Sequence, residues 1–304
     1  MEKVLVTGGC GFIGSHIVEE LINSNYEVVV IDNLSTGKIE NIDTDKVEFF
    51  QCDILSEDFG KIVSQVNPTY IIHQAAQVSV AESVKNIGKD TAINIQGSVN
   101  VIEAAKSNNV KKIVFASSAA VYGEPNELPI PVEHQVSPQS PYGLSKLTVE
   151  KYLELAQTLY GIDYTILRYS NVYGPRQDAK GEGGVVAIFT DRANSNEAPF
   201  IYGDGEQTRD FIFVKDVAKA NVASLTKANN KILNISTNTS ISVNELFNVI
   251  TEIAGVKLTP IYENERTGDI KHSRLDNQVA SESLGLEFDT NLAIGIKATL
   301  EYRK

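Results

Sequence analysis

The chain has 304 residues, of which 42% are hydrophobic and 22% are charged. This length and composition predict one large α/β domain with a smaller one attached. The formal net charge of −12 argues against nucleic acid as a partner, because binding a phosphate backbone requires a basic surface. An acidic chain can still hold a single nucleotide in a local pocket.

The N-terminal stretch contains the pattern around which the chain is organised. Residues 4–6 form a short apolar run, and the sequence TGGCGFIG follows directly at 7–14. Apolar residues then recur at helical spacing as far as Ile22, and a second apolar run at 28–31 ends in Asp32. This order of strand, glycine-rich turn, helix, strand and acidic residue predicts a dinucleotide-binding βαβ unit rather than a plain turn.

Each part of this unit has a chemical role. Gly8 permits a tight turn, Gly11 lets the backbone approach a pyrophosphate, and Gly14 lets helix and strand pack closely. The N–H groups and the positive dipole end of the helix then face the phosphates. The Asp32 carboxylate can accept hydrogen bonds from both ribose hydroxyls and would repel a 2′-phosphate, so we expect NAD rather than NADP.

Strands and helices alternate through the next part of the chain. Strands are predicted at 47–52, 70–74, 112–116 and 164–167, and helices at about 87–109 and 142–160. The stretch 124–141 holds five of the nine prolines and is therefore predicted to be a loop. This alternation predicts an α/β fold, a Rossmann-type doubly wound parallel sheet with ligands at the carboxyl ends of its strands.

Beyond Asn171 the alternation is less regular. A helix is predicted at 185–194, short strands at 200–202 and 211–214, and a buried strand at 231–235. Ser242 and Glu245 form a capping-box pattern at the start of a helix that runs to Ala254. We therefore expect an NAD-binding Rossmann domain and a smaller, interleaved C-terminal α/β substrate lobe, composed respectively of residues 1–173 with 210–240 and residues 174–209 with 241–304.

Three side chains are candidates for catalysis. Ser118 follows the strand predicted at 112–116, at the sheet edge where the cofactor is expected. Tyr142 and Lys146 are four residues apart at the start of the next helix, so both project from one face. A tyrosine with the usual pKa of about 10 is a poor base at neutral pH. We expect the Lys146 ammonium to lower the pKa of Tyr142, and the Ser118 hydroxyl to orient the substrate oxygen.

The motifs together resemble a known family over almost the whole chain. Beside TGGCGFIG they are HQAAQ at 73–77, SSAAVYG at 117–123, PYGLSK at 141–146, LRYSNVYGPRQ at 167–177, GDGEQTRDFIFVKD at 203–216 and RTGD at 266–269. The chain is similar to extended short-chain dehydrogenases/reductases. Within them it most resembles the NAD-dependent UDP-glucose (UDP-galactose) 4-epimerase group of sugar-nucleotide epimerases.

This resemblance implies the residues of two binding sites. NAD would contact Gly8, Gly11, Phe12, Ile13, Gly14, Asp32, Asn33, Asp53, Ile54, Ala75, Ala76, Gln77, Tyr142 and Lys146. The substrate would contact Ser118, Tyr142, Asn171, Val185, Tyr202, Arg209, Arg266, Asp269 and Ser273. Asp53 and Ile54 would flank the adenine. The substrate's diphosphate would be held by Asn171, Arg209 and Arg266, and its ribose by Asp269. Surface ion pairs are the alternative role for the two arginines.

The implied reaction interconverts UDP-glucose and UDP-galactose through a 4-keto intermediate on NAD that stays bound. Tyr142, as a phenolate, would take the proton of the sugar 4-hydroxyl. Relatives that dehydrate or decarboxylate nucleotide sugars place an acidic residue just after the catalytic Ser or Thr. Here Ala119 and Ala120 follow Ser118, so epimerisation is favoured. The small Ser273 stands where a large aromatic residue restricts the pocket. One hypothesis is therefore that UDP-GlcNAc and UDP-GalNAc are also substrates. The alternative is that His272 or another neighbour fills the space.

Two other interpretations stay open. Another NAD-dependent nucleotide-sugar enzyme of the same fold would share most of these motifs, such as a UDP-glucuronate decarboxylase or epimerase, a dTDP-sugar dehydratase or a reductase. A non-catalytic nucleotide-binding protein would not need Ser118, Tyr142 and Lys146 together. The four histidines are scattered, so we expect no metal site.

The remaining expectations concern location and assembly. Cys10 and Cys52, the only cysteines, are expected to be free thiols in a reducing cytosol. No signal peptide is apparent, and no apolar run approaches the roughly 20 residues that span a bilayer. We therefore expect a cytoplasmic protein without a membrane or nucleic-acid partner. By analogy with the relatives, helices 87–109 and 142–160 are expected to pair in a four-helix homodimer interface.

Overall fold

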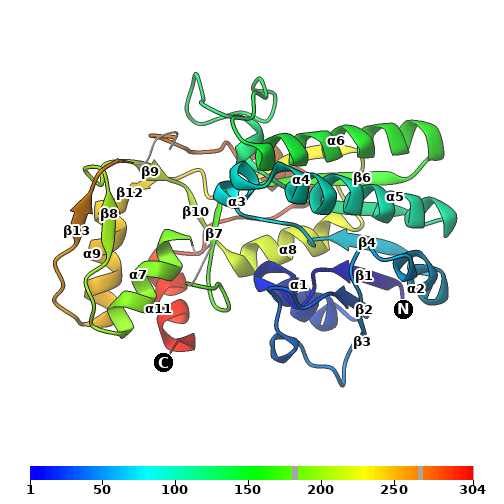
Figure 1. The fold of residues 1–304 in the computed structure, drawn as a ribbon, viewed down its shortest axis with the longest axis horizontal. Helices are drawn as coiled ribbons and strands as arrows, with labels where there is room; N and C mark the ends of the chain where they lie inside the picture. The colour runs from blue at the N-terminus through cyan, green and yellow to red at the C-terminus, as the bar shows by residue number, and fades with distance from the viewer. Residues whose placement is uncertain (180–183, 266–269, 304) are drawn as a thin grey trace.

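A seven-stranded parallel sheet forms the centre of the larger part of the molecule in this computed structural model, which describes residues 1–179, 184–265 and 270–303 (Figure 1). The strands are β1 (Lys3–Thr7), β2 (Glu27–Asp32), β3 (Glu48–Gln51), β4 (Tyr70–His73), β5 (Lys112–Ser118), β6 (Asp163–Tyr169) and β11 (Lys231–Ile235). They are hydrogen-bonded in the order β11-β6-β5-β4-β1-β2-β3. The order reverses between β1 and β4, and in doubly wound sheets ligands bind at this switch point, beyond the carboxyl ends of the strands.

Helices cover both faces of this sheet. One face carries α1 (Phe12–Asn23), α8 (Val214–Ser224) and α10 (Gln278–Leu284), and the other carries α2 (Asp58–Val66), α5 (Gly97–Ser107) and α6 (Pro141–Tyr160). Successive strand residues point to opposite faces: Val4 and Val6 lie in the core under α1, whereas Leu5 lies in the core under α2. Because both faces are buried, the strands are continuous apolar runs in the sequence.

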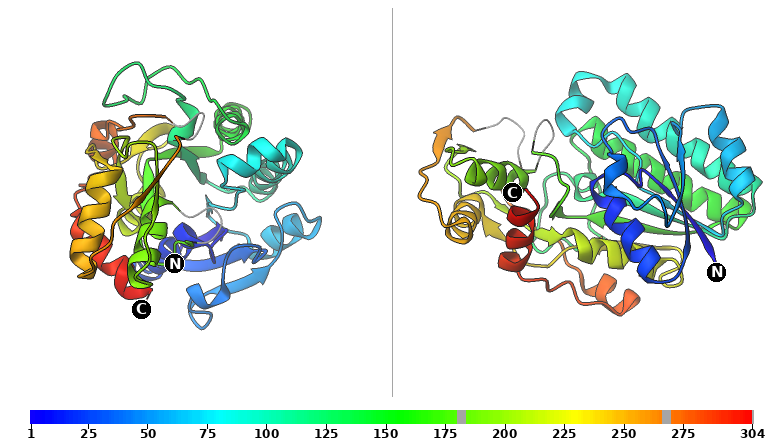
Figure 2. Two further views of the ribbon diagram at one scale, coloured as in Figure 1. Left: turned by 60° about the vertical axis from the view of Figure 1, so that its left-hand side comes forward. Right: turned by 90° about the horizontal axis from the view of Figure 1, so that it is seen from below.

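The smaller part contains α7 (Val185–Asn194), α9 (Val243–Ala254) and α11 (Leu292–Tyr302) around a third core. Its short strands pair in twos: β7 (Asn171–Tyr173) with β10 (Phe211–Phe213), β8 (Phe200–Tyr202) with β13 (Ile261–Glu263), and β9 (Thr208–Arg209) with β12 (Ile241–Ser242). The N-terminus lies in the larger part and the C-terminus in the smaller one (Figure 2). Ile212 enters the core of the larger part, while Phe211 and Phe213 enter that of the smaller one, so β10 joins the two.

The Rossmann-type fold predicted from the sequence is confirmed, and several predicted elements coincide with observed ones, among them α7, β8 and β11. The predicted capping box is also present. Ser242 Oγ accepts a hydrogen bond from Glu245 N at 3.1 Å, and Glu245 Oε2 accepts one from Ser242 N at 2.7 Å. These elements were predictable because their apolar periodicity and their caps are local in the sequence.

Other elements differ from the prediction. The helix predicted at 87–109 is divided into α4 (Ile87–Asp90), a π-helical segment η2 (Thr91–Gln96) and α5. The short helices α3 (Val80–Lys85), η1 (Ile39–Asn41) and η3 (Ala119–Val121) were not predicted, and neither were α2, α8, α10 and α11. Helix α8 begins directly after β10 without a loop, so no turn residue in the sequence marks its start.

The C-terminal segment departs from the predicted division of the chain. That division places residues 241–304 in the smaller lobe. Ala280 and Leu284 of α10, and Phe288 after it, instead lie in the same core as α1 and α8, and α10 packs against β11. The exact domain boundaries remain a prediction.

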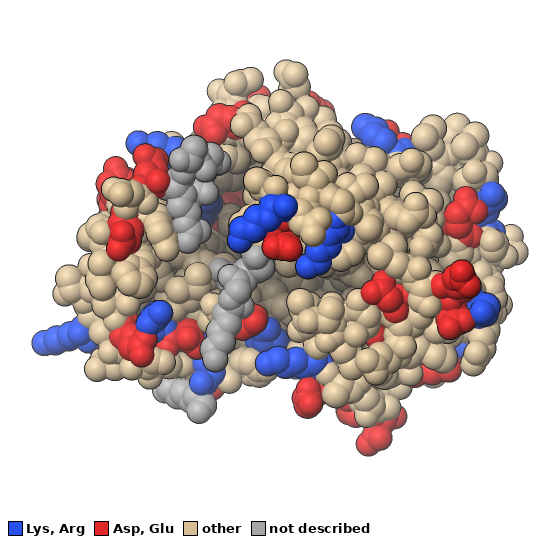
Figure 3. Space-filling view, in the orientation of Figure 1, with Lys and Arg blue, Asp and Glu red and all other residues tan. Residues whose placement is uncertain are grey.

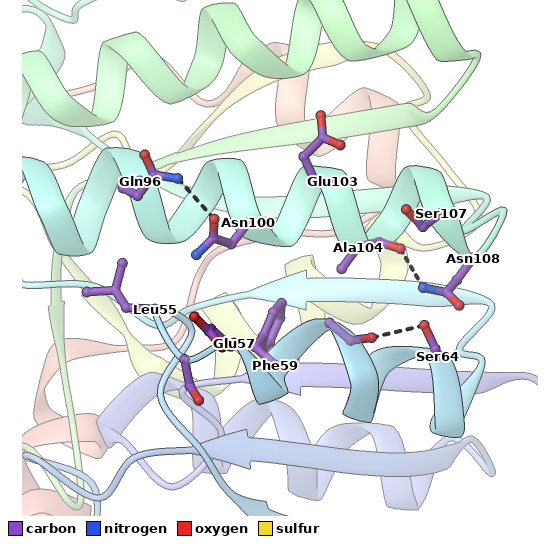
Figure 4. A pocket seen from close by; sticks show the side chains of 12 residues that line it. Leu55, Glu57, Phe59, Ser64, Gln96, Asn100, Glu103, Ala104, Ser107 and Asn108 are labelled. Carbon is purple, nitrogen blue, oxygen red and sulfur yellow. Dashed lines mark hydrogen bonds between the residues drawn. The ribbon is translucent and has the colours of Figure 1, made fainter.

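A groove with a volume of about 590 Å³ lies on the outer surface between α2 and α5 (Figure 4). Phe59 and Ser64 of α2 lie on one side of it, and Asn100 and Ser107 of α5 lie on the other. Its lining residues all come from 55–64 and 96–108, whereas the predicted catalytic residues lie at 118, 142 and 146. None of the three predicted catalytic residues lines this groove.

Candidate active site

The glycine-rich turn between β1 and α1 leaves no room for a side chain at Gly8 or Gly14. Gly8 has a φ of +70°, a backbone conformation that other residues rarely adopt. A Cβ on Gly14 would lie 2.1 Å from the Gly8 carbonyl oxygen, so helix and turn can approach each other only at a glycine. The N-cap residue of α1 is Gly11, and no side chain among the described residues caps the start of this helix. The N–H groups of this helix start are thus available to an anion.

The acidic residue predicted to bind ribose is held rigidly at the end of β2. Asp32 Oδ2 accepts a hydrogen bond from Cys10 N at 2.9 Å, and its Oδ1 accepts one from Leu34 N at 2.8 Å. Beside it, Asn33 Nδ2 donates to Asp53 Oδ2 at 2.7 Å, which connects the ends of β2 and β3. A glycine cradle, an uncapped helix start and a carboxylate at the next strand end fit the expected dinucleotide.

The remaining residues predicted to bind the cofactor lie along the same sheet edge. Phe12 and Ile13 are the first two residues of α1, and Ile54 follows Asp53 after β3. Ala75 to Gln77 follow β4, next to the glycine turn, since a Cβ on Gly8 would lie 2.7 Å from Ala75 N. All of these positions are at carboxyl ends of strands, where the topology places a ligand.

The three predicted catalytic residues are brought together at the end of β5. Ser118 is the last residue of β5, and its Oγ accepts a hydrogen bond from Ala120 N at 3.2 Å. Its hydroxyl also acts on Tyr142, because it partly lowers the pKa of that phenol. Tyr142 and Lys146 lie in the first turns of α6. The buried Lys146 Nζ donates to the Ala116 carbonyl oxygen at 2.8 Å, which ties α6 to β5.

The start of α6 is well defined locally. The Ser140 Oγ accepts a hydrogen bond from Gly143 N at 3.1 Å, and Pro141 occupies the first helical position. Proline is favoured there because its fixed φ suits a helix and its missing N–H would have no helical partner. This cap determines where the helix starts and so how far Tyr142 lies from Ser118.

One sequence-based expectation about the tyrosine is wrong for the protein by itself. Lys146 was expected to lower the pKa of Tyr142, but burial raises that pKa to about 12, with a partial opposing effect of the hydrogen bond to Ser118 and a further increase from Asp90. Lys146 Nζ lies 5.8 Å from the centroid of the Tyr142 ring, and burial lowers the pKa of Lys146 itself to about 8. Desolvation favours the uncharged form of both groups.

A polar network that the sequence did not reveal lies behind the catalytic residues. Asn94 Nδ2 donates to Asp90 Oδ1 at 3.0 Å, to the Gln77 carbonyl oxygen at 2.9 Å and to Ser145 Oγ at 3.2 Å. Gln77 Nε2 donates to the same Asp90 oxygen at 2.9 Å. Ser145 stands directly before Lys146, so the network connects the cofactor edge to the catalytic helix. The only sequence signal was a pair of polar residues, four apart, in an otherwise amphipathic helical stretch.

A second buried cluster supports α6 one turn further on. The carboxylate of Glu150 receives two hydrogen bonds from Arg168, one from Nε at 3.0 Å and one from Nη2 at 2.6 Å. Ser117 Oγ donates to the same carboxylate at 2.5 Å, and Arg168 lies over the ring of Tyr122, 4.8 Å from its centroid. Glu150 is 0% exposed and Arg168 is 3% exposed, so this is a buried, bidentate ion pair.

Apart from Ser118 and Tyr142, the predicted substrate residues that the structure describes lie in the smaller part or where it joins the larger one. Asn171 begins β7 and Val185 begins α7. Arg209 and Ser273 lie next to each other, since Arg209 Nη1 donates to the Thr208 carbonyl oxygen at 2.9 Å and Ser273 N donates to that same oxygen at 3.2 Å. Tyr202 ends β8 and contributes, with residues 203–204, 207, 265 and 270–271, to a cavity of about 270 Å³. Arg266 and Asp269 lie outside the described residues.

Cys10 is buried and Cys52 is partly buried, and both are free thiols. Within residues 1–179, 184–265 and 270–303, no group of three His, Cys, Asp or Glu side chains is placed to hold a metal ion. His73 is buried between the hydroxyls of Thr7, at 2.7 Å, and Ser98, at 2.9 Å.

Of the helices that the structure describes, none is both long enough and apolar enough to span a membrane.

Comparison with known proteins places these features in a family context. Residues 4–236 match the NAD dependent epimerase/dehydratase family. The chain is 49% identical over 302 residues to a putative UDP-glucose 4-epimerase of Methanocaldococcus jannaschii, and the alignment covers 99% of this chain and 98% of that protein.

Solved structures agree with this match. A UDP-glucose 4-epimerase of Thermotoga maritima, solved with UDP-glucose, superposes with a TM-score of 0.96 at 45% identity, covering 99% of this chain and 98% of the other. A UDP-N-acetylglucosamine 4-epimerase of Methanobrevibacter ruminantium, in complex with UDP-N-acetylmuramic acid, superposes with a TM-score of 0.95 at 38% identity. That alignment covers 99% of this chain and 97% of the other.

Proposed function

The chain belongs to the NAD dependent epimerase/dehydratase family, and we propose that it interconverts the C4 epimers of a UDP-sugar through a 4-keto intermediate, with NAD as a tightly bound cofactor. The observation that carries the proposal is the grouping of Ser118, Tyr142 and Lys146 at the end of β5, at the same sheet edge as the glycine turn. Ala119 and Ala120 follow Ser118, so no acidic side chain stands there to drive an elimination.

In the proposed reaction Tyr142 is the acid and base. When bound in its oxidised form, NAD supplies a hydride acceptor for C4 of the sugar and a positive charge that favours a phenolate. The Tyr142 phenolate takes the proton from the sugar 4-hydroxyl and later returns it. The pKa of about 12 that burial imposes on the phenol means that the protein's own residues keep Tyr142 protonated until that positive charge is present.

Ser118 and Lys146 assist the proton transfer in this proposal. The Ser118 hydroxyl, which partly lowers the pKa of Tyr142, stabilises the phenolate and orients the substrate oxygen. The Lys146 ammonium has one N–H committed to the Ala116 carbonyl oxygen at 2.8 Å, and its other two would be available to the nicotinamide ribose and to the phenolate. Holding these groups in one geometry replaces an encounter in solution by a prearranged site.

The cofactor and substrate residues inferred from the resemblance are part of the same proposal. The turn at Gly8, Gly11 and Gly14 would hold the pyrophosphate of NAD, and Asp32 the adenosine ribose. Arg209, beside Ser273, would hold the diphosphate of the substrate, which leaves the sugar free to turn and present either face. We propose that the two lobes predicted from the sequence bind the cofactor and the substrate, respectively. Residues 278–288 are added to the cofactor-binding lobe.

Product analysis tests which UDP-sugar is the substrate. Purified protein is incubated with UDP-galactose, and separately with UDP-GalNAc, without added NAD, and the products are resolved by NMR. Conversion to the 4-epimer without added cofactor is the expected result, and Tyr142→Phe serves as the inactive control. If neither sugar is converted even after NAD is added, the proposed function is refuted, and uronic-acid substrates or a binding role take its place.

The substrate range rests on Ser273. Because its side chain is small, we propose that the N-acetylated pair is accepted besides the plain pair. A Ser273→Tyr variant should lose turnover of UDP-GalNAc while it keeps turnover of UDP-galactose. Turnover of UDP-galactose alone by the natural protein would refute the wider range, and another neighbour such as His272 would then be the restricting residue.

We also propose a cytoplasmic homodimer. Helix α6 exposes a row of apolar residues on one side, with Leu144 at 55%, Leu155 at 53% and Leu159 at 64% exposure. The surface over α5 and α6 carries few charged side chains (Figure 3). Contiguous exposed apolar surface of this kind is typical of protein interfaces.

The mass in solution tests the dimer. Light scattering should give the natural protein twice the mass of one chain. The Leu159→Glu variant should have the mass of a single chain. Ile294 on α11 is also 64% exposed, so Ile294→Glu is the matched control and should leave the mass unchanged. A natural chain with the mass of a single copy would refute the proposal.

A further inference from the structure

Asp90 is a buried carboxylate that the proposed reaction does not use. It is the last residue of α4 and is 1% exposed. Its Oδ1 accepts hydrogen bonds from Gln77 Nε2 at 2.9 Å and Asn94 Nδ2 at 3.0 Å, whereas its Oδ2 is buried without a hydrogen-bond partner in the part of the chain that the structure describes. An ionised carboxylate in such surroundings needs a nearby positive charge, because burial removes its hydration.

The local backbone directs this carboxylate and its partner inward. Asp90 directly precedes the π-helical segment Thr91–Gln96, and that segment packs against α6. Such π-helical segments are frequent at functional sites, because they change which side chains face a neighbour. Here both Asp90 and Asn94 are buried, although they lie in a stretch with exposed residues such as Thr91 and Gln96.

The network brings Asp90 into the electrostatic surroundings of the catalytic pair. Asn94 joins the Asp90 carboxylate to Ser145 Oγ, at 3.2 Å, and Ser145 Oγ donates to the Tyr142 carbonyl oxygen at 2.9 Å. The Asp90 charge acts on both functional groups, because it raises the pKa of Lys146 against the lowering effect of burial and adds to the raised pKa of Tyr142.

We propose that Asp90 is a positioning residue for the proposed epimerase reaction: its carboxylate keeps Lys146 in the ammonium form within a desolvated site and, through Asn94, holds the Tyr142–Lys146 turn of α6 at the cofactor edge. This proposal rests on the proposed function. The buried ammonium and the buried carboxylate compensate each other, so each is tolerated because the other is present. Asp90 touches neither reacting atoms nor, in this proposal, the cofactor.

The other titratable groups around the pair do not take over this role. On β4, burial lowers the pKa of His73 to about 3, so it is neutral. On β6, burial raises the pKa of Tyr169 to about 12, so it is also neutral. On α6 itself, Glu150 is paired with Arg168. Glu82 of α3 and Lys89 of α4 form a more solvent-exposed pair 3.5 Å apart, and Lys85 of α3 is exposed.

The test is Asp90→Asn, which keeps the size of the side chain and removes its charge. Removing a negative charge lowers the pKa of both Tyr142 and Lys146, so both should titrate lower. In protein labelled with ¹³Cζ-tyrosine and saturated with NAD, the Tyr142 NMR titration, assigned with Tyr142→Phe, should move down by about one pH unit. The acidic limb and the basic limb of the pH profile of kcat should both move to lower pH. A merely structural defect would lower kcat without moving either limb.

Two further variants make the result decisive. Asp58→Asn makes the same change at an exposed ion pair on α2, where Asp58 lies 2.7 Å from Lys61, and should move neither the titration nor the limbs. Asp90→Glu keeps the charge, so its Tyr142 midpoint should stay at the natural value even if kcat falls. An unchanged midpoint in Asp90→Asn, or an equal shift in Asp90→Glu, would overturn the proposal. Absence of epimerisation by the natural protein would instead overturn the proposed function, while the NMR titration would still decide the role of Asp90.

Discussion

The ion pair between Glu150 and Arg168 allows a quantitative test of how the catalytic helix is held in place. Glu150→Gln removes the charge but keeps the shape of the side chain. It leaves a guanidinium that is 3% exposed, with the Val132 carbonyl oxygen at 3.2 Å and the ring of Tyr122 at 4.8 Å as its remaining partners. Breaking a buried pair by removing one partner costs about 3–5 kcal/mol, because a charge stays buried without compensation.

The remaining partners set the expected value within this range. A cation over an aromatic ring contributes about 0.5–2 kcal/mol and the carbonyl hydrogen bond continues to act, so we expect Glu150→Gln to lower the free energy of unfolding by about 3 kcal/mol. Arg168→Met should cost a similar amount, since it leaves the carboxylate with Ser117 as its hydrogen-bond donor, at 2.5 Å. The double variant buries no charge, so its cost should fall short of the sum of the two by about 2 kcal/mol or more.

Urea unfolding followed by circular dichroism, at one fixed NAD concentration for all variants, measures these values. The m-value should be the same in all four proteins, because the surface exposed on unfolding does not change. A loss below about 1 kcal/mol in either single variant would refute the argument. Additive costs in the double variant would do so as well, because they would mean that Glu150 and Arg168 do not depend on each other.

Three further outcomes are expected. Tyr142→Phe should reduce kcat by about 10²–10⁴-fold while the NAD content of the purified protein stays unchanged, because only the acid–base group is lost. Gly14→Ala should lose NAD during purification, measured by absorbance after denaturation, because the new Cβ would lie 2.1 Å from the Gly8 carbonyl oxygen; full NAD content would contradict this. Burial lowers the pKa of His16 in the folded protein to about 4, below its unfolded value of 6.5. Its contribution to stability is therefore complete above pH 6.5 and is lost as the pH falls toward 4, by about 1.4 kcal/mol per pH unit. His16→Gln should reduce the slope of unfolding free energy against pH by about 1 kcal/mol per pH unit between pH 6 and 5, and an equal slope in both proteins would refute it.

Local patterns in the sequence were sufficient to predict the cofactor side of the fold. The turn at Gly8, Gly11 and Gly14 and the carboxylate at Asp32 stand in one βαβ unit of neighbouring residues, where apolar spacing and glycine positions limit the backbone to few conformations. The pair Tyr142 and Lys146 was predictable for the same reason, since four residues of one helix determine that both project from the same side.

The tertiary structure decided the properties that depend on residues far apart in the chain. The position of α10 in the core of the larger part depends on contacts with α8 and β11, which no local pattern encodes. The raised pKa of Tyr142 likewise comes from burial by several elements and from Asp90, so the helical spacing of Lys146 alone led to the wrong direction. Spacing along the chain determines which way a side chain points, but the charge state of a group depends on how completely the folded protein removes it from water.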